Sequence, residues 1–167
     1  MDRIERAFVI LCRIGTGAAF AVLIIAVLTQ VIGRAAFNAS PPWTEELTRY
    51  AMLWMIACAA GLSFRTGDLV GVDVFSEALP RPWPWRMRLL AALATAGVCA
   101  VLIEPAWRFT AVGSRQSSPV LGIGMNAVHA SILALLVLLM LFALLRAAAM
   151  LLGGSDGRPV PNPDSQE

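Results

Sequence analysis

An unbroken run of 20 uncharged, mostly apolar residues, Ile14–Gly33, constrains this chain more than any other feature of its sequence. A helix of about 20 apolar residues crosses the roughly 30 Å hydrocarbon core of a bilayer. A second run, Gln116–Leu145, is uncharged for 30 residues, which accommodates one such helix preceded by a non-helical stretch. The sequence therefore predicts an integral membrane protein.

The composition favours the same class of protein. Hydrophobic residues make up 58% of the 167 residues and charged residues only 14%, whereas about a quarter of an ordinary soluble domain is charged. The net charge is +2, and no basic cluster is interleaved with aromatic residues, so we expect no nucleic-acid partner. The cysteines are odd in number and lie in or beside apolar runs, so we expect Cys12, Cys58 and Cys99 to act as small buried hydrophobic residues.

Two shorter runs of 15 uncharged residues each, Tyr50–Phe64 and Leu89–Ile103, complete the predicted set of spans. Arginine side chains at their ends can extend into the headgroup region, and Trp83, Trp85 and Trp107 bracket the second of them as an interfacial aromatic belt. The first apolar run is too long for a cleaved signal peptide, so we expect it to be retained. The predicted fold is an all-α integral membrane protein with four transmembrane helices.

The arginine distribution predicts the orientation of these helices. With a cytoplasmic N-terminus, nine of the 13 arginines face the cytoplasm and four face the other side, as the positive-inside rule favours. Both termini are then cytoplasmic. We expect residues 1–152 to form the four-helix membrane domain. Residues 153–167, rich in Gly, Pro, Ser and acidic residues, should form a disordered cytoplasmic tail.

The connection between the second and third spans predicts a further short helix. Residues 69–79 contain no proline, and their apolar residues recur at helical spacing while Asp73 and Glu77 occupy another face. We expect an amphipathic helix along the inner membrane surface. The proline-rich run 80–85 should then break the helix and anchor the chain at the interface.

The start of the second helix is the most informative polar stretch. Thr44 is suited to cap the helix, with Glu45 and Glu46 in its first turn and Arg49 within reach of either carboxylate. One interpretation is a well-capped helix start beside an interfacial Trp43. The other is a charged docking surface for another chain. Acid–base catalysis is disfavoured, because neighbouring residues in one turn point in different directions.

The few polar groups at membrane depth carry a functional hypothesis by default. They include Gln30 and His129, the single histidine, for which a hydrogen bond between helices and a proton relay are both open. Glu104 lies four residues before Arg108 and should pair with it at the outer interface. The chain has no catalytic or metal-ligand motif, whereas small residues at helical spacing, such as Ala57 with Gly61, favour close helix packing.

The combination of these features resembles the small membrane subunit of tripartite ATP-independent periplasmic (TRAP) transporters. The likeness is carried by Gly33-Arg34, by Pro42-Trp43-Thr44-Glu45-Glu46-Leu47-Thr48-Arg49-Tyr50, and by Trp54, Gly61, Arg65-Thr66-Gly67, Val72-Asp73 and Ser118-Pro119-Val120-Leu121-Gly122-Ile123. Two positions depart from the family pattern: Leu69 stands where relatives often carry His, and Gly124 where Pro is common.

The resemblance implies a non-enzymatic subunit without a cofactor, in the bacterial inner membrane. In that family a large polytopic membrane subunit holds the substrate and sodium sites and moves in an elevator-like manner. A soluble periplasmic protein captures an organic acid and delivers it. The small subunit is implied to be a fixed scaffold, in contact with membrane lipid, that braces the large one. By this analogy the expected partner contacts are Arg34, Trp43, Glu45, Glu46, Arg49, Tyr50 and Trp54.

A second hypothesis is a self-sufficient, proton-coupled exporter that acts as a homo-oligomer. It requires a titratable group deep in the bilayer, and His129 is its candidate. An intramembrane enzyme ranks third, because no set of nucleophile, base and orienting group is evident.

Overall fold

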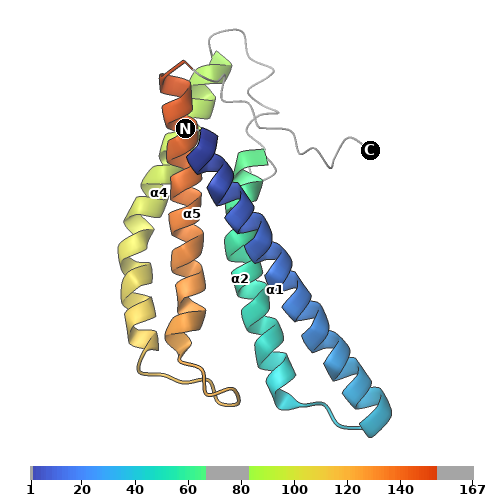
Figure 1. Ribbon diagram of the computed structural model, residues 1–167. Helices are drawn as coiled ribbons and strands as arrows, with labels where there is room; N and C mark the ends of the chain where they lie inside the picture. Colours follow the sequence, from blue (N-terminus) through green and yellow to red (C-terminus); the bar gives the residue numbers. More distant parts are fainter. Residues whose placement is uncertain (1, 67–82, 154–167) are drawn as a thin grey trace, which may run out of the picture.

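The computed structural model of the chain describes residues 2–66 and 83–153. This part contains four helices: α1 (Asp2–Phe37), α2 (Pro42–Thr66), α4 (Trp83–Gly113) and α5 (Met125–Leu151), labelled as in Figure 1. Each of the four is long and apolar enough to cross a membrane. The all-helical class and the four predicted spans are confirmed.

The helices extend well beyond the uncharged runs in the sequence. The 15 uncharged residues Tyr50–Phe64 lie inside a helix of 25 residues, which is about 37 Å long at 1.5 Å per residue. Arg49 and Arg65 therefore lie within α2, near its two ends. This extension makes the second span long enough to cross the hydrocarbon core.

A proline at the start of α2 corrects one prediction. Thr44 is not the cap of α2, because the helix begins two residues earlier at Pro42 and the Thr44 hydroxyl donates to the Pro41 carbonyl oxygen at 2.7 Å. The predicted break at the run 80–85 concerns the helix 69–79, which lies outside the described residues, and α4 begins at Trp83 with Pro84 in its first turn. The same physical principle accommodates Pro42 and Pro84. A first-turn N–H group has no acceptor inside its helix, so proline is tolerated there.

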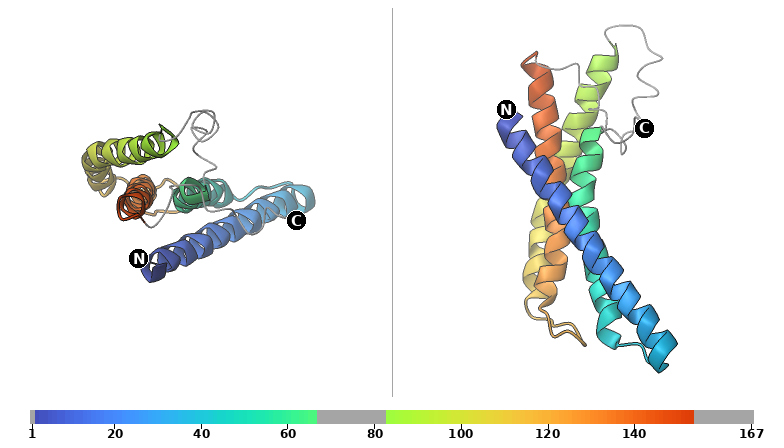
Figure 2. Two further views of the ribbon diagram at one scale, coloured as in Figure 1. Left: turned by 90° about the horizontal axis from the view of Figure 1, so that it is seen from above. Right: turned by 45° about the vertical axis from the view of Figure 1, so that its right-hand side comes forward.

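The helices form two hairpins: α1 and α2 make the first, and α4 and α5 make the second. The two hairpins meet along a seam between α2 and α5. α1 packs against α2, α4 packs against α5, and α2 and α5 contact each other less extensively between the hairpins. Figures 1 and 2 show that the two hairpins diverge toward the end where residues 38–41 and 114–124 lie. We call this the loop end. The N-terminus of α1 and the C-terminus of α5 lie at the opposite end.

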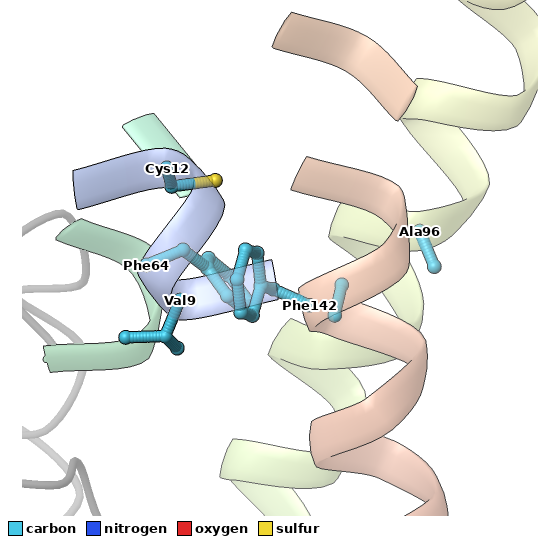
Figure 3. Packing of buried hydrophobic residues seen from close by; sticks show 6 residues of the cluster. Val9, Cys12, Phe64, Ala96 and Phe142 are labelled. Atoms are coloured by element: carbon cyan, nitrogen blue, oxygen red, sulfur yellow. The ribbon is translucent and has the colours of Figure 1, made fainter. Parts of the chain in front are cut away.

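The main hydrophobic cluster draws residues from all four helices and lies toward the end opposite the loops. Phe142 of α5 points from its helix toward Phe64 of α2 and Val9 of α1 (Figure 3). Gly61 allows this approach, because a Cβ at that position would lie 2.9 Å from the Phe142 ring. Outside the cluster, large apolar side chains remain exposed along all four helices, as expected for surfaces that face lipid or another membrane subunit.

Three predictions concern features beyond this description. The predicted interfacial helix 69–79 and nearly all of the predicted tail lie outside the described residues. The cytoplasmic orientation of the two ends stays a prediction, with which their position at one end of the molecule agrees.

Candidate partner-contact site

All seven predicted contact residues lie on the last turn of α1 or on the first half of α2. The structure divides them by exposure. Arg34, Trp43, Glu45, Arg49 and Trp54 are exposed, whereas Glu46 and Tyr50 are half-buried.

The exposed residues of α2 do not form one patch. Trp43 and Trp54 are 11 residues apart, close to three full turns, so they share one face of the helix. Glu45 and Arg49 lie about 200–240° around the helix from Trp43, at 100° per residue. The predicted site is therefore an aromatic face and a charged face on opposite sides of α2.

The charged face is held by a local ion pair. Arg49 Nη2 lies 3.4 Å from Glu45 Oε1, and both side chains are mostly exposed. The predicted pair between Glu104 and Arg108 is also present, on α4, with a separation of 2.5 Å and similar exposure. Exposed pairs of this type contribute at most about 1 kcal/mol to stability. Glu45 and Arg49 are thus available for contacts outside the chain.

Glu46 points toward the second hairpin instead. Its Oε2 accepts a hydrogen bond from the Ser118 hydroxyl and another from the Leu121 backbone N–H, at 3.1 Å for the latter. One turn further along α2, the Tyr50 hydroxyl donates to Met125 Sδ at 3.8 Å. These two side chains connect α2 to the loop 114–124 and to the first residue of α5.

Within the loop 114–124, the backbone of residues 116–124 folds back on itself compactly. Ser118 N donates to Ile123 O at 2.8 Å, Met125 N donates to Gln116 O at 2.9 Å, and Ser117 pairs with Gly124 in an antiparallel bridge. Gly122 has a φ of 67°, which glycine adopts without the cost of a Cβ. Sequence reasoning missed Ser118 as the partner of Glu46, since a pair 72 residues apart has no spacing signal.

His129 joins α4 to α5, as the first of its two open interpretations predicted. Its Nδ1 lies 3.2 Å from the Phe109 carbonyl oxygen, and its ring stacks on the Phe109 ring with centroids 3.8 Å apart. It lies four residues after the start of α5, close to the loop end rather than in the middle of the span. This position lends no support to the exporter hypothesis.

The described residues hold no group of three or more His, Cys, Asp or Glu side chains that could bind a metal ion. Cys12 and Cys99 are buried, as predicted, and Cys58 is partly buried; all three are free thiols. These features define a small polytopic membrane protein in which a few polar side chains fasten one helix or loop to another.

Comparison with known proteins places the chain within that class. Residues 23–153 match the family described as tripartite ATP-independent periplasmic transporters, DctQ component, and the chain belongs to this family. A TRAP transporter small permease protein of Haemophilus influenzae is 27% identical over 120 residues, which are 72% of each chain. The chain is thus a small permease component of a TRAP transporter in the bacterial inner membrane, and it is not an enzyme. The predicted family is confirmed.

Proposed function

We propose that this chain is a fixed scaffold that braces the large membrane subunit of its transporter. The complex carries out sodium-coupled uptake of an organic acid delivered by a periplasmic binding protein. In this proposal both termini are cytoplasmic, the loop end faces the periplasm, and the chain holds no substrate or sodium site of its own.

The observation that carries the proposal is the open arrangement of the helices. α1 and α4 lie at the two ends of the contact order α1, α2, α5, α4, and the two hairpins share a single seam. The half of α1 nearer the loop end exposes a continuous series of apolar side chains that includes Ile25, Leu28, Val31 and Ile32. Surfaces of this kind favour packing against another membrane-embedded chain.

The seven residues on the last turn of α1 and the first half of α2 are proposed to serve the contacts with the other subunits. The exposed Arg34, Trp43, Glu45, Arg49 and Trp54 are placed to touch a partner directly. Tyr50 and Glu46 are half-buried and hold α2 against the second hairpin. Tryptophan and arginine are residue types that often dominate the binding energy of an interface.

The first test is purification of the tagged chain from its native membranes in a mild detergent, with the co-purifying proteins identified by mass spectrometry. We expect a stoichiometric large polytopic protein. A homo-oligomer without such a partner would contradict the scaffold role and favour the exporter.

The contact residues are tested by charge reversal. Glu46→Arg and Arg49→Glu should each weaken co-purification of the large subunit or transport in membrane vesicles, while membrane insertion is unchanged. Arg108→Glu is the matched control, because Arg108 is an exposed, ion-paired arginine on α4 outside the proposed contact set. Wild-type transport by both α2 variants would show that the assignment is wrong.

A further inference from the structure

We infer that Glu46 is a positioning residue whose ionised carboxylate fastens residues 116–124 of the loop to α2. The loop, held in this way, sets the shape of the outer surface that the rest of the transporter meets. This inference rests on the proposed function, because it assumes that a partner meets the loop end. In it, Glu46 acts through the loop and does not touch the partner.

The carboxylate is the centre of a small hydrogen-bond network. Glu46 Oε2 accepts from the Ser118 hydroxyl and from the Leu121 N–H, and the Leu121 N–H is also 3.1 Å from Ser118 Oγ. Ser118 is 4% exposed, so its hydroxyl is withdrawn from water and depends on a partner within the protein. One acidic side chain of the first hairpin thus organises two residues of the second.

The hydrogen bonds to Glu46 attach the tip of the loop to α2. Its backbone hydrogen bonds, such as Ser118 N to Ile123 O, fix the loop internally but do not connect it to the other hairpin. Two apolar side chains near its tip are turned outward, with Val120 49% and Ile123 41% exposed, whereas Leu121 is half-buried. The sulfur contact of Tyr50 reaches only Met125, at the far end of the loop.

The charge of Glu46 is essential to this role. Hydrogen bonds to an ionised acceptor are about twice as strong as neutral ones, and a single carboxylate oxygen accepts two donors here. A glutamine at this position keeps the shape of the side chain and one oxygen but loses the charge. The neighbouring Glu45 carries the same charge on the exposed face, so the two acids form a natural pair of test and control.

The first experiment measures amide hydrogen exchange at Leu121 in the purified full-length chain. Glu46→Gln should speed this exchange by about 10-fold, because the hydrogen bond from Leu121 then has a neutral acceptor in place of a charged one. Ser118→Ala should speed it to a smaller extent, because the Glu46 acceptor remains. Glu45→Gln should leave it at the wild-type rate. Equal rates in wild type, Glu46→Gln and Ser118→Ala would overturn the inference.

The second experiment separates positioning from direct contact. Glu46→Cys and Ser118→Cys are combined in a background in which Cys12, Cys58 and Cys99 are replaced by serine. Co-purification of the large subunit should be lost before treatment and recovered after a short bifunctional thiol reagent joins the two introduced cysteines. Restored attachment without restored co-purification would mean that the carboxylate itself contacts the partner, and the inference would be wrong.

The two experiments keep this inference distinct from the scaffold proposal. If the wild-type chain captures no large subunit, the scaffold proposal fails, whereas the exchange rate of Leu121 still reports whether Glu46 holds the loop. If the wild-type complex forms and Glu46→Gln leaves both exchange and co-purification unchanged, only the positioning role fails.

Discussion

The imidazole of His129 and the phenyl ring of Phe109 stack with their centroids 3.8 Å apart, and the same imidazole reaches the Phe109 carbonyl oxygen. This contact ties the last turns of α4 to the first turns of α5. It uses the only histidine of the chain for packing between helices at the loop end. The sequence alone allowed His129 to form either a hydrogen bond between helices or a proton relay. In the structure its side chain makes a contact between helices.

Replacement of His129 distinguishes the scaffold hypothesis from the exporter hypothesis. In His129→Gln the side-chain amide can still reach the Phe109 carbonyl, so we expect transport by the complex within about twofold of wild type and a small loss of thermal stability from the lost ring stacking. Uptake in proteoliposomes that contain the complete transporter is the measurement. Complete loss of coupled transport in a variant that still assembles would favour the proton relay.

Gly113 should tolerate no side chain. A Cβ there would lie 2.5 Å from His129 Nδ1 and 2.8 Å from the Asn126 backbone nitrogen. Because a backbone atom cannot move aside cheaply, Gly113→Ala should destabilise the isolated chain by about 1–3 kcal/mol. Gly97→Ala, on the same helix, is the control: a Cβ there meets nothing within 4 Å. Thermal unfolding followed by tryptophan fluorescence compares the two, and equal melting temperatures would contradict the close packing.

The seam between α2 and α5 depends on Gly61 and Phe142. Gly61→Ala should force the Phe142 ring out of the main cluster and cost about 1–3 kcal/mol. Phe142→Leu shortens the side chain that the new methyl group meets. The loss of unfolding free energy in the double variant should therefore be smaller than the sum of the losses in the two single variants, by at least about 0.5 kcal/mol. Strict additivity in a double-mutant cycle of unfolding free energies would show that the two residues do not contact each other.

Exchange of the two charges on α2 distinguishes an internal ion pair from a partner contact. Glu45→Arg combined with Arg49→Glu keeps the pair within the chain, so the stability of the isolated chain should change by less than about 1 kcal/mol. Capture of the large subunit should still fall severalfold, because each charge now meets the wrong partner group. The same exchange of Glu104 and Arg108 on α4 is the control and should leave capture unchanged. Full capture by the α2 variant would remove these residues from the contact set.

The helices were predictable because hydrophobic length is a local property. Ile14–Gly33 and Gln116–Leu145 each meet the length requirement of a span directly, and the structure has one spanning helix over each. The pairs Glu45–Arg49 and Glu104–Arg108 were predictable for a similar reason, since residues four apart are neighbours on any helix.

The helix starts were less predictable. Thr44 has the right chemistry for a cap, but the preference of proline for the first helical position displaced the start of α2 to Pro42. α4 begins at Trp83 with Pro84 in its first turn, six residues before the uncharged run Leu89–Ile103. Local signals compete at such positions, and the backbone requirement of proline outweighed the others.

The contacts between hairpins could not be predicted from the sequence. The hydrogen bond between Glu46 and Ser118 joins residues 72 positions apart, and no periodicity records such a distance. The small-residue pair Ala57 and Gly61 correctly indicated a closely packed helix face, but it could not identify Phe142 as the side chain that fills the space. The sequence thus indicated the candidate contact residues as a prediction, but not which of them point inward or what they meet there.

The construction from two hairpins also bears on how the chain enters the membrane. Each hairpin begins and ends at the same end of the molecule, and its turn at the loop end is short: residues 38–41 in one and 114–124 in the other. With cytoplasmic termini, these two turns are the polar stretches between the described helices that biosynthesis must translocate. In that orientation the first hairpin would leave the ribosome before α5 is made, and the Glu46 carboxylate would cross the bilayer before Ser118 and Leu121 are available to it. The attachment of the loop is then a late step of assembly, completed when the second hairpin arrives.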